Sequence, residues 1–358
     1  MRIEFYKKEV HSSLLDPKEG FFRKSIAFEL RKDPLTGHVS RILPFRFKLP
    51  QTQIPTEVIE SSRKNCPFCP EQVASFTPKL VPEIAPEGRI QKGEALLFPN
   101  SFPYAQYNWV AVLSGEHFLY LDQFSTETLK NGFLVAQHGI DRLRRNEPES
   151  EFASINWNYL PQAGGGILHP HLQVVVEGTP TSSHRKVIEG IRKYKTERDS
   201  FFWDDLLSEE VRIGERYIGK IGNIHFLTAF SPLGILGEVL ILFSNKDRIE
   251  ELTAQDWEDF SEGLVKVFRF LKAQHIESFN LSVFSGGGNG VRSWVYGRLC
   301  PRITIPPWNT SDINYFEKLH DEVVCVVSPE EMCEELKASF CGDKRKKWDE
   351  DRKGKWGS

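Results

Sequence analysis

Residues 163–176, with the sequence AGGGILHPHLQVVV, decide the fold and the chemistry that we predict for this chain. The run of glycines predicts a flexible turn that leads into a short strand. Because side chains alternate between the two faces of a strand, His169, His171 and Gln173 should share one face. Pro170 lacks a backbone donor, so it belongs at the beginning or on the edge of that strand. The stretch therefore predicts two imidazoles and an amide that face a cleft.

The residue types in this stretch are those that phosphoryl or nucleotidyl transfer needs. Gly164, Gly165 and Gly166 allow a close backbone approach and aim N–H groups at an anion. His171 is the predicted nucleophile, because a neutral imidazole carries a lone pair at pH 7 when its other nitrogen donates to a fixed acceptor, such as a nearby backbone carbonyl. Gln173 is suited to donate to a phosphate oxygen whose charge grows in the transition state. The alternative is an edge strand after a loop that carries histidines without a catalytic role.

The composition is that of an ordinary soluble globular protein, with 358 residues, 40% hydrophobic and 27% charged. A net charge of −3 gives no support for nonspecific nucleic-acid binding. No apolar run is long enough to predict a transmembrane helix. The N-terminus lacks an apolar signal core and the 6 cysteines are too sparse for a disulfide scaffold. We therefore expect a cytoplasmic protein in a reducing environment.

The two halves of the chain predict the same order of elements, which is strand, long helix, strand, glycine turn and strand, at an offset of roughly 130 residues. Strands are expected at 95–100, 109–113, 152–157, 223–230, 238–243, 278–284 and 291–303, and long helices at about 125–145 and about 253–274. The first half carries His169 and His171 where the second carries Tyr296 and Arg298. Only the first half therefore has a nucleophile-like pair.

These patterns predict an α+β fold of two tandem units, each an antiparallel sheet with packed helices. The first unit, 1–208, holds the histidine pair, and the second unit, 209–341, is a degenerate copy of it. Residues 1 to about 60 predict short strands and turns, and 181 to about 207 a largely helical segment. The charged residues 342–358 are expected to form a disordered tail.

Cys66 and Cys69 form a Cys-x-x-Cys pair, which is half of a metal site. His169 is a suitable third ligand because it adjoins the predicted nucleophile, and His117, at the end of a predicted strand, is a suitable fourth. A Cys2His2 set of this kind would bind zinc in a closed, structural site. The alternative is a pair of buried thiols with unrelated histidines.

Taken together, these motifs resemble the galactose-1-phosphate uridylyltransferase branch of the histidine triad superfamily, over about residues 30–340. Residues 169–173 are similar to the His-Pro-His-x-Gln motif of the family. The resemblance implies catalytic roles for His171 and Gln173 and a zinc site at Cys66, Cys69, His117 and His169. It also implies the following substrate contacts: Arg46, Phe68, Asn100, Ser101, Phe102, Asn158, Gly164, Gly165 and Gly166.

The chain departs from the family pattern at several places. A second phosphate-contacting arginine of the family falls on Leu49, beside Lys48. Family members with a second metal use histidines where this chain has Tyr296 and Arg298, so we expect no iron site. The segment that contacts the hexose is poorly matched around 306–309. These departures weaken the assignment of the sugar acceptor more than the assignment of the nucleotidyl-transfer reaction.

The resemblance implies a ping-pong reaction in which His171 takes a nucleoside monophosphate from an NDP-sugar, UDP-glucose first of all, and passes it to a hexose 1-phosphate. Such a uridylyltransferase would act in galactose and carbohydrate metabolism, without nucleic-acid or membrane partners, and could form a homodimer. One alternative is a phosphorylase of the same superfamily, with orthophosphate as the acceptor and an ADP-sugar or a dinucleoside polyphosphate as the donor. The other is a non-catalytic nucleotide-binding protein, against which the intact His171 and Gln173 argue.

Overall fold

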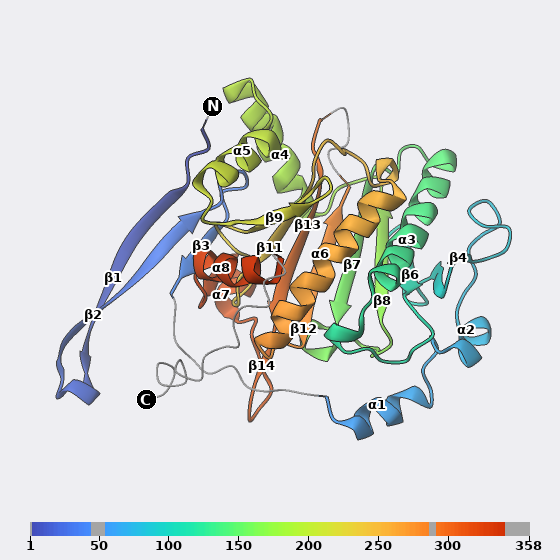
Figure 1. Ribbon diagram of the computed structural model, residues 1–358, viewed down its shortest axis with the longest axis horizontal. Coiled ribbons are helices and arrows are strands. Elements are labelled where there is room, and N and C mark those ends of the chain that lie inside the picture. Colours follow the sequence, from blue (N-terminus) through green and yellow to red (C-terminus); the bar gives the residue numbers. More distant parts are fainter. Residues whose placement is uncertain (1, 44–53, 286–290, 341–358) are drawn as a thin grey trace.

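The computed structural model describes residues 2–43, 54–285 and 291–340 (Figure 1). The predicted phosphate ligand Arg46, the tip of the second glycine turn and the predicted tail lie outside these residues. The strands are β1 (Tyr6–Asp16), β2 (Phe22–Lys32), β3 (Val39–Ile42), β4 (Ile90–Lys92), β5 (Ala95–Pro99), β6 (Tyr107–Val112), β7 (Phe152–Tyr159), β8 (His171–Glu177), β9 (Tyr217–Ile221), β10 (Ile224–Thr228), β11 (Val239–Phe243), β12 (Ser278–Phe284), β13 (Val295–Arg302), β14 (Thr304–Ile305), β15 (Thr310–Ser311) and β16 (Glu322–Cys325). The helices are α1 (Thr56–Arg63), α2 (Pro70–Phe76), α3 (Thr126–Asn146), α4 (Ser182–Arg198), α5 (Phe202–Ile213), α6 (Ala254–Ala273), α7 (Tyr315–His320) and α8 (Pro329–Phe340), with short 3-10 turns at Leu121–Gln123, Pro161–Ala163 and Ile249–Glu251 among others.

A 10-stranded sheet, in the order β4-β5-β6-β8-β7-β12-β13-β11-β10-β9, forms the centre of the fold. The five strands on each side of the β7–β12 contact come from one half of the chain. The middle contact pairs β7 with β12 antiparallel, so that the two halves share one continuous sheet. The predicted α+β class with antiparallel sheets is confirmed. The predicted boundary between 208 and 209 falls within α5.

The long helices α3 and α6 lie side by side on one face of this sheet (Figure 1). Their apolar sides pack on the sheet and on each other, and the rings of Phe133 and Trp257 stack at 5.0 Å between centroids. Ser125 caps α3 and Thr253 caps α6, as the sequence predicted, because each side chain accepts a hydrogen bond from a first-turn backbone N–H. This face of the sheet is therefore the closed, apolar side.

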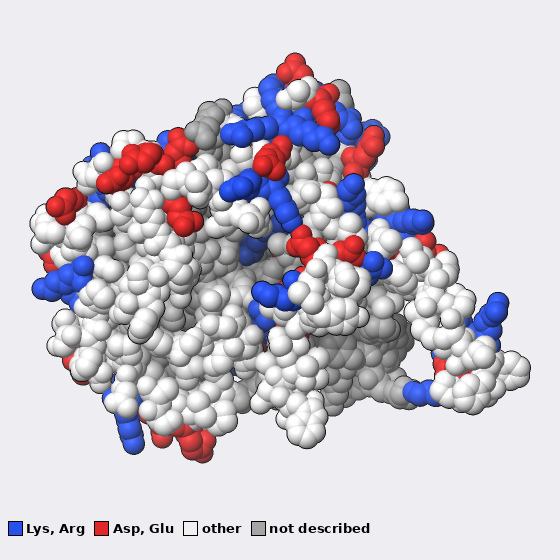
Figure 2. All heavy atoms as spheres, turned by 180° about the vertical axis from the view of Figure 1, so that it is seen from behind, with Lys and Arg blue, Asp and Glu red and all other residues white. Residues whose placement is uncertain are grey.

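The opposite face is covered unevenly. In the second half, α4, α5 and the N-terminal residues pack over β10, β11 and β13, with Ile191, Trp203 and Tyr296 in one buried apolar cluster. Lys, Arg, Asp and Glu lie mainly around the rim of this face, and side chains without formal charge cover much of its middle (Figure 2). The first half carries its predicted catalytic residues on the same face, at β8.

The N-terminal region differs from the prediction of short strands and turns. β1 and β2 are 11-residue strands that form a long antiparallel hairpin, which projects from the body of the molecule (Figure 1). The hairpin continues through β3, which pairs in parallel with β16 from the C-terminal part of the chain. The helical stretch predicted from 181 is interrupted at Asp199, which adopts a left-handed conformation with φ 48°. Within the described residues, no helix has the length and apolar character that crossing a membrane requires.

Candidate active site and metal-binding cluster

His171 is the first residue of β8, directly after Pro170, as expected for a proline at the beginning of a strand. Its Nδ1 lies 2.7 Å from the backbone oxygen of His169, two residues earlier. A carbonyl can only accept, so Nδ1 carries the proton and Nε2 keeps its lone pair. Burial lowers the pKa of His171, although the bond to the carbonyl acts in the opposite direction. The predicted backbone acceptor is confirmed, and it leaves a neutral imidazole with one free nitrogen.

Carboxamides lie near His171 on this face, while Val112 of β6 is directly opposite it. Gln173 follows on the same strand, and Asn156 of β7 is directly opposite it. Asn158, two residues further along β7, therefore projects from the same face and is exposed. The hydroxyl of Tyr104 donates to Oε1 of Gln173, which leaves the Nε2 donor of Gln173 directed away from Tyr104. The predicted pair of an imidazole and an amide on one face is present.

The glycine turn before β8 is built differently from the prediction. The N–H groups of Gly164 and Gly165 donate to the backbone oxygens of Pro161 and Leu160, at 2.9 Å and 3.0 Å, so they hold the turn together. The prediction that all three glycines offer N–H groups to an anion is therefore wrong for these two. Gly166 has no backbone partner for its N–H among the described residues. Leu160 has φ 71°, a conformation that costs free energy and is concentrated at functional sites.

Four buried side chains converge next to His171 and could hold a metal ion. The ligand atoms of Cys66, Cys69, His117 and His169 all lie within 4.8 Å of one another. Nδ1 of His169 is 3.7 Å from each sulfur, and Nδ1 of His117 is 3.4 Å from Sγ of Cys69. Zinc bonds of about 2.3 Å to sulfur and about 2.0–2.1 Å to nitrogen place tetrahedral ligands about 3.5–3.6 Å apart. The residues predicted for zinc therefore fit a tetrahedral metal ion in both chemistry and spacing.

The outer nitrogens of both histidines are fixed by hydrogen bonds. Nε2 of His169 lies 2.8 Å from the backbone oxygen of Ser114, and Nε2 of His117 lies 2.8 Å from Oγ of Ser62. A donated proton at these positions leaves Nδ1 of each ring as the ligand atom. Burial, and after it the charge of the neighbouring Cys66, raises the pKa of Cys69 to about 11. Two adjacent thiolates are therefore stable here only when a cation lies between them.

Residues 100–102, which are predicted substrate contacts, form the turn after β5. Asn100 uses its carboxamide inside this turn, donating to Oδ1 of Asn108 and accepting from the N–H of Phe102. Ser101 and Phe102 are exposed, with 85% of Phe102 accessible to solvent. Phe68, between the two cysteines, is buried, and its ring lies 5.1 Å from that of His171. Asn100 therefore shapes the turn, Phe102 offers an open ring, and Phe68 packs against His171.

The second half carries other side chains at the corresponding positions of its middle strand. Gln173 lies between Val110 and Asn156 in the first half, and Arg298 lies between Leu240 and Ser282 in the second. Nε and Nη2 of Arg298 both donate to the buried carboxylate of Glu238. At the position that corresponds to His171, Tyr296 is buried against Trp203 and Phe284, with ring centroids 5.3 Å and 5.0 Å away. At these two positions β13 therefore offers neither an imidazole nor an amide.

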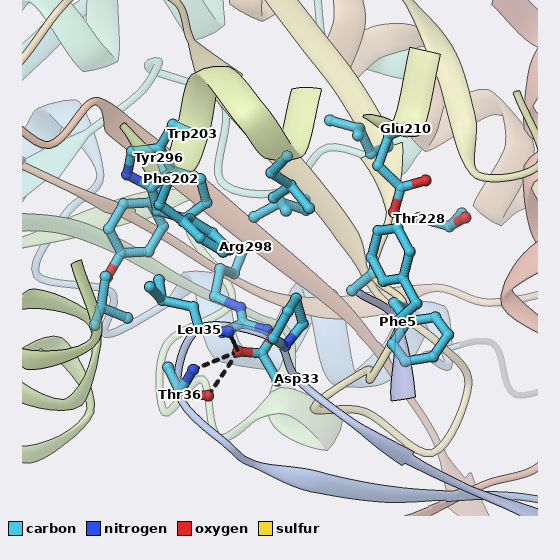
Figure 3. A pocket seen from close by; sticks show the side chains of 17 residues that line it. Phe5, Asp33, Leu35, Thr36, Phe202, Trp203, Glu210, Thr228, Tyr296 and Arg298 are labelled. Carbon is cyan, nitrogen blue, oxygen red and sulfur yellow. Dashed lines mark hydrogen bonds between the residues drawn. The ribbon is translucent and has the colours of Figure 1, made fainter. Parts of the chain in front are cut away.

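A pocket in the second half lies over these same strands (Figure 3). The turn that begins at Asp33 forms one wall, and the opposite wall comes from α5. Its lining is mainly aromatic and aliphatic, with Asp33, Glu210 and Arg298 as charged members, and its interior has room for only a few water molecules. None of the residues of the His171 site lines it. The pocket is consequently too small for a nucleotide and separate from the predicted chemistry.

Sequence reasoning missed two residues that contact the site. Asn280 of β12 donates to Oδ1 of Asn158 at 2.7 Å and to the backbone oxygen of Ala163 at 2.9 Å. Tyr104 contacts Gln173, as described above. The alternation of Asn280 and Ser282 with apolar residues placed both on the polar face of a predicted strand, but the partner strand could not be read from one sequence.

Comparisons with known proteins agree with this architecture. No family model matches the chain. An uncharacterized protein of Archaeoglobus fulgidus is 29% identical over 311 residues, which cover 86% of this chain and 91% of that protein. A GalT-like protein and an ADP-glucose phosphorylase with bound ADP-glucose, both from Arabidopsis thaliana, each superpose with a TM-score of 0.66 over 86% of this chain and 98% and 97% of theirs, at 15% and 16% identity. A uridylyltransferase mutant superposes with a TM-score of 0.64 over 87% of this chain and 99% of its own, at 15% identity. The chain thus has the GalT-like fold that its motifs predicted.

Proposed function

We propose that the protein is a nucleotidyltransferase that uses His171 as a covalent nucleophile. The observation that carries this proposal is the fixed tautomer of His171, whose Nδ1 is held by the carbonyl of His169 at 2.7 Å. Nε2 attacks the α-phosphorus of an NDP-sugar, an N–P bond forms, and the bond to the leaving sugar 1-phosphate breaks. The imidazole becomes cationic in this step, and the carbonyl of His169 stabilises the charge on Nδ1–H. A phosphate oxygen of the acceptor then attacks the same phosphorus, the N–P bond breaks, and His171 is released.

The neighbouring amides are proposed to bind the transferred phosphoryl group. Gln173 and Asn158 both project from the face that carries His171, and Oε1 of Gln173 is already occupied by the Tyr104 hydroxyl. Their N–H donors suit the nonbridging oxygens of a phosphate. We keep Arg46, Asn100, Ser101, Phe102, Phe68 and the residues of the glycine turn as proposed substrate contacts, with Gly166 as the turn residue whose N–H is open.

The proposed donor is UDP-glucose and the proposed acceptor is a hexose 1-phosphate. We also propose that the chain consists of two related units, of which only the first is catalytic. A phosphorylase with an ADP-sugar donor and an orthophosphate acceptor is the second candidate. It is supported by the ADP-glucose phosphorylase, which superposes as well as the GalT-like protein does. The proposed metal is zinc, held by Cys66, Cys69, His117 and His169, and its role is structural because all four positions come from the protein.

The test of this function is a donor screen with isolated half-reactions. The protein is incubated with UDP-glucose, ADP-glucose or diadenosine tetraphosphate, each labelled in the transferred nucleotide, and precipitated to detect labelled protein. A labelled adduct with one donor, discharged by either a hexose 1-phosphate or orthophosphate, assigns both the donor and the acceptor. Nucleotide binding without an adduct for any donor would contradict the enzyme and favour the binding protein.

A further inference from the structure

We propose that Asn280, Arg302 and Asp312 are positioning residues that fix the direction in which Asn158 presents its amide. All three lie in the second half of the chain, with Asn280 in β12, Arg302 in β13 and Asp312 after β15. Asn280 is directly opposite Asn158 in that contact, and the two amides are joined by a 2.7 Å hydrogen bond. The proposal rests on the proposed function, because it assumes that a nucleotide lies against Asn158.

The arrangement begins at a buried ion pair. Asp312 is buried, and its carboxylate accepts from Nε of Arg302 at 2.9 Å, from Nη2 of Arg302 at 2.6 Å and from the N–H of Ile303 at 3.1 Å. Such a fork-to-carboxylate pair fixes the plane of the guanidinium group. The remaining nitrogen, Nη1, is thereby aimed at Oδ1 of Asn280, which it reaches at 2.5 Å.

The direction of each amide follows from the hydrogen-bonding capacity of its neighbour. A guanidinium group has donors only, so Asn280 must turn its oxygen toward Arg302 and its NH2 group the other way. That NH2 group donates to Oδ1 of Asn158 and to the backbone oxygen of Ala163, at 2.7 Å and 2.9 Å. The oxygen of Asn158 is therefore used, and its Nδ2 has no partner within the described part of the chain. Asn158 is exposed, so this donor is open to a ligand.

In the first half, the direction of the Gln173 amide is likewise set by the hydrogen-bonding capacity of its neighbour. The Tyr104 hydroxyl donates to Oε1 of Gln173, so Gln173 also presents its NH2 group. Two amides with donors outward require a ligand that is rich in acceptors, which is the chemistry of a phosphate group. The bond from Asn280 to Ala163 also ties down the residue just before Gly164. The second half thus sets both the polarity of Asn158 and the position of the glycine turn.

Asn280→Asp tests the proposal because it preserves shape and reverses hydrogen bonding. An aspartate still accepts from Arg302 but cannot donate to Asn158 or Ala163, so Asn158 must rotate and present its oxygen to the phosphate. We expect binding of UDP-glucose or ADP-glucose, measured by calorimetry, to weaken about tenfold for the lost hydrogen bond. Ser282→Ala, at the next position of β12 on the same face, is the matched control and should bind with wild-type affinity.

A double-mutant cycle separates positioning from general support of the fold. If Asn280 acts through Asn158, Asn280→Asp should add almost nothing in an Asn158→Ala background. Losses that simply add would overturn the proposal.

Hydrogen exchange of the Asn158 side-chain NH2 group, assigned by its absence from the Asn158→Ala spectrum, gives a readout that needs no substrate. We expect fast exchange in the wild type and slow exchange in Asn280→Asp, where the group donates to the new carboxylate. If the wild type binds no nucleotide, the proposed function fails, and this exchange alone decides the positioning role: equal rates in the two proteins would overturn it.

Discussion

The two halves of the molecule have the same strand order on each side of β7 and β12 but differ in what their middle strands carry. In β8, His171 is buried and Gln173 half-buried, and one polar atom of each side chain is held by a hydrogen bond to a neighbouring residue while the other has no partner among the described residues. In β13, Tyr296 and Arg298 lie under α5. Tyr296 packs in an apolar cluster, and Arg298 forms an ion pair with Glu238. The difference teaches that the same strand arrangement can carry different side chains, and that a function must be argued from the donors and lone pairs that these side chains present.

The comparison also assigns a use to the second half. Its face is covered by α4 and α5, and it holds the buried ion pair of Arg298 with Glu238. From the second half Asn280 donates to Asn158, and from the first half Gln137 of α3 donates to the backbone oxygens of Ile249 and Leu252. The presence of Tyr296 and Arg298 in place of His171 and Gln173 is therefore compatible with a supporting role for the second half.

His171→Gly should give the largest effect. Removal of the nucleophile should lower overall transfer by several orders of magnitude and leave a space the size of an imidazole. A preformed nucleoside phosphorimidazolide, or free imidazole, should restore one half-reaction. Turnover assays with and without imidazole measure both effects.

The corresponding change in the second half is the control for this result. Tyr296→Phe removes only a hydroxyl from a buried ring and should keep wild-type transfer. A comparable loss in both variants would contradict the division of labour between the halves.

Cys66→Ser should come next, because it removes one of four clustered ligands. Metal analysis of the wild type should give about one zinc per chain, and the variant should lose the metal together with several degrees of thermal midpoint. Cys333→Ser, which changes a buried cysteine of α8 outside the cluster, should keep its zinc. A metal-free wild type that is folded and active would remove the zinc site from the account.

Gly165→Ala should have an intermediate effect on the first half. A Cβ at this position would lie 2.8 Å from the backbone oxygen of Asn158 and 3.0 Å from that of Leu160, so the turn must shift. We expect about 1–3 kcal/mol of lost stability and a transfer rate lower by about 10–100-fold, because a small displacement of positioned groups is costly. Gly178→Ala, where the nearest atom is 3.5 Å away, should change neither denaturant unfolding nor turnover.

Glu238→Gln should have the smallest effect on transfer and still reduce stability. The variant leaves the charge of Arg298 largely buried without its partner, which costs up to about 3–5 kcal/mol. The unfolding midpoint in urea should fall, while nucleotide binding at β8 should remain. A folded variant that fails to bind would show that the second half takes part in the site more directly than the comparison allows.

Local features of the site could be predicted from the sequence. The His-Pro-His motif fixes its own tautomer because the acceptor carbonyl lies only two residues away. The convergence of Cys66, Cys69, His117 and His169 could be predicted because the two cysteines are close in sequence and because the motifs occur in the order of a known family. Strand and helix periodicity likewise placed β7, β8, α3 and α6 within a few residues.

Features that depend on long-range pairing could not be predicted. The support of Asn158 by Asn280 requires that β7 pairs with β12, and one sequence does not contain that register. The connection of the β1–β2 hairpin, through β3, to β16 depends on strands that are far apart along the chain. The N–H groups of Gly164 and Gly165 were predicted to be free, but they close a turn whose geometry follows from the left-handed Leu160.

Mass spectrometry of the donor-treated protein tests the central claim most directly. After brief exposure to UDP-glucose or ADP-glucose without acceptor, and digestion under basic conditions that preserve a phosphoramidate, the peptide that contains 169–173 should carry one nucleoside monophosphate. Fragmentation should place it on His171, and mild acid should remove it. An adduct on His169 or on any other residue, or transfer that proceeds at full rate with no adduct on His171, would contradict the account.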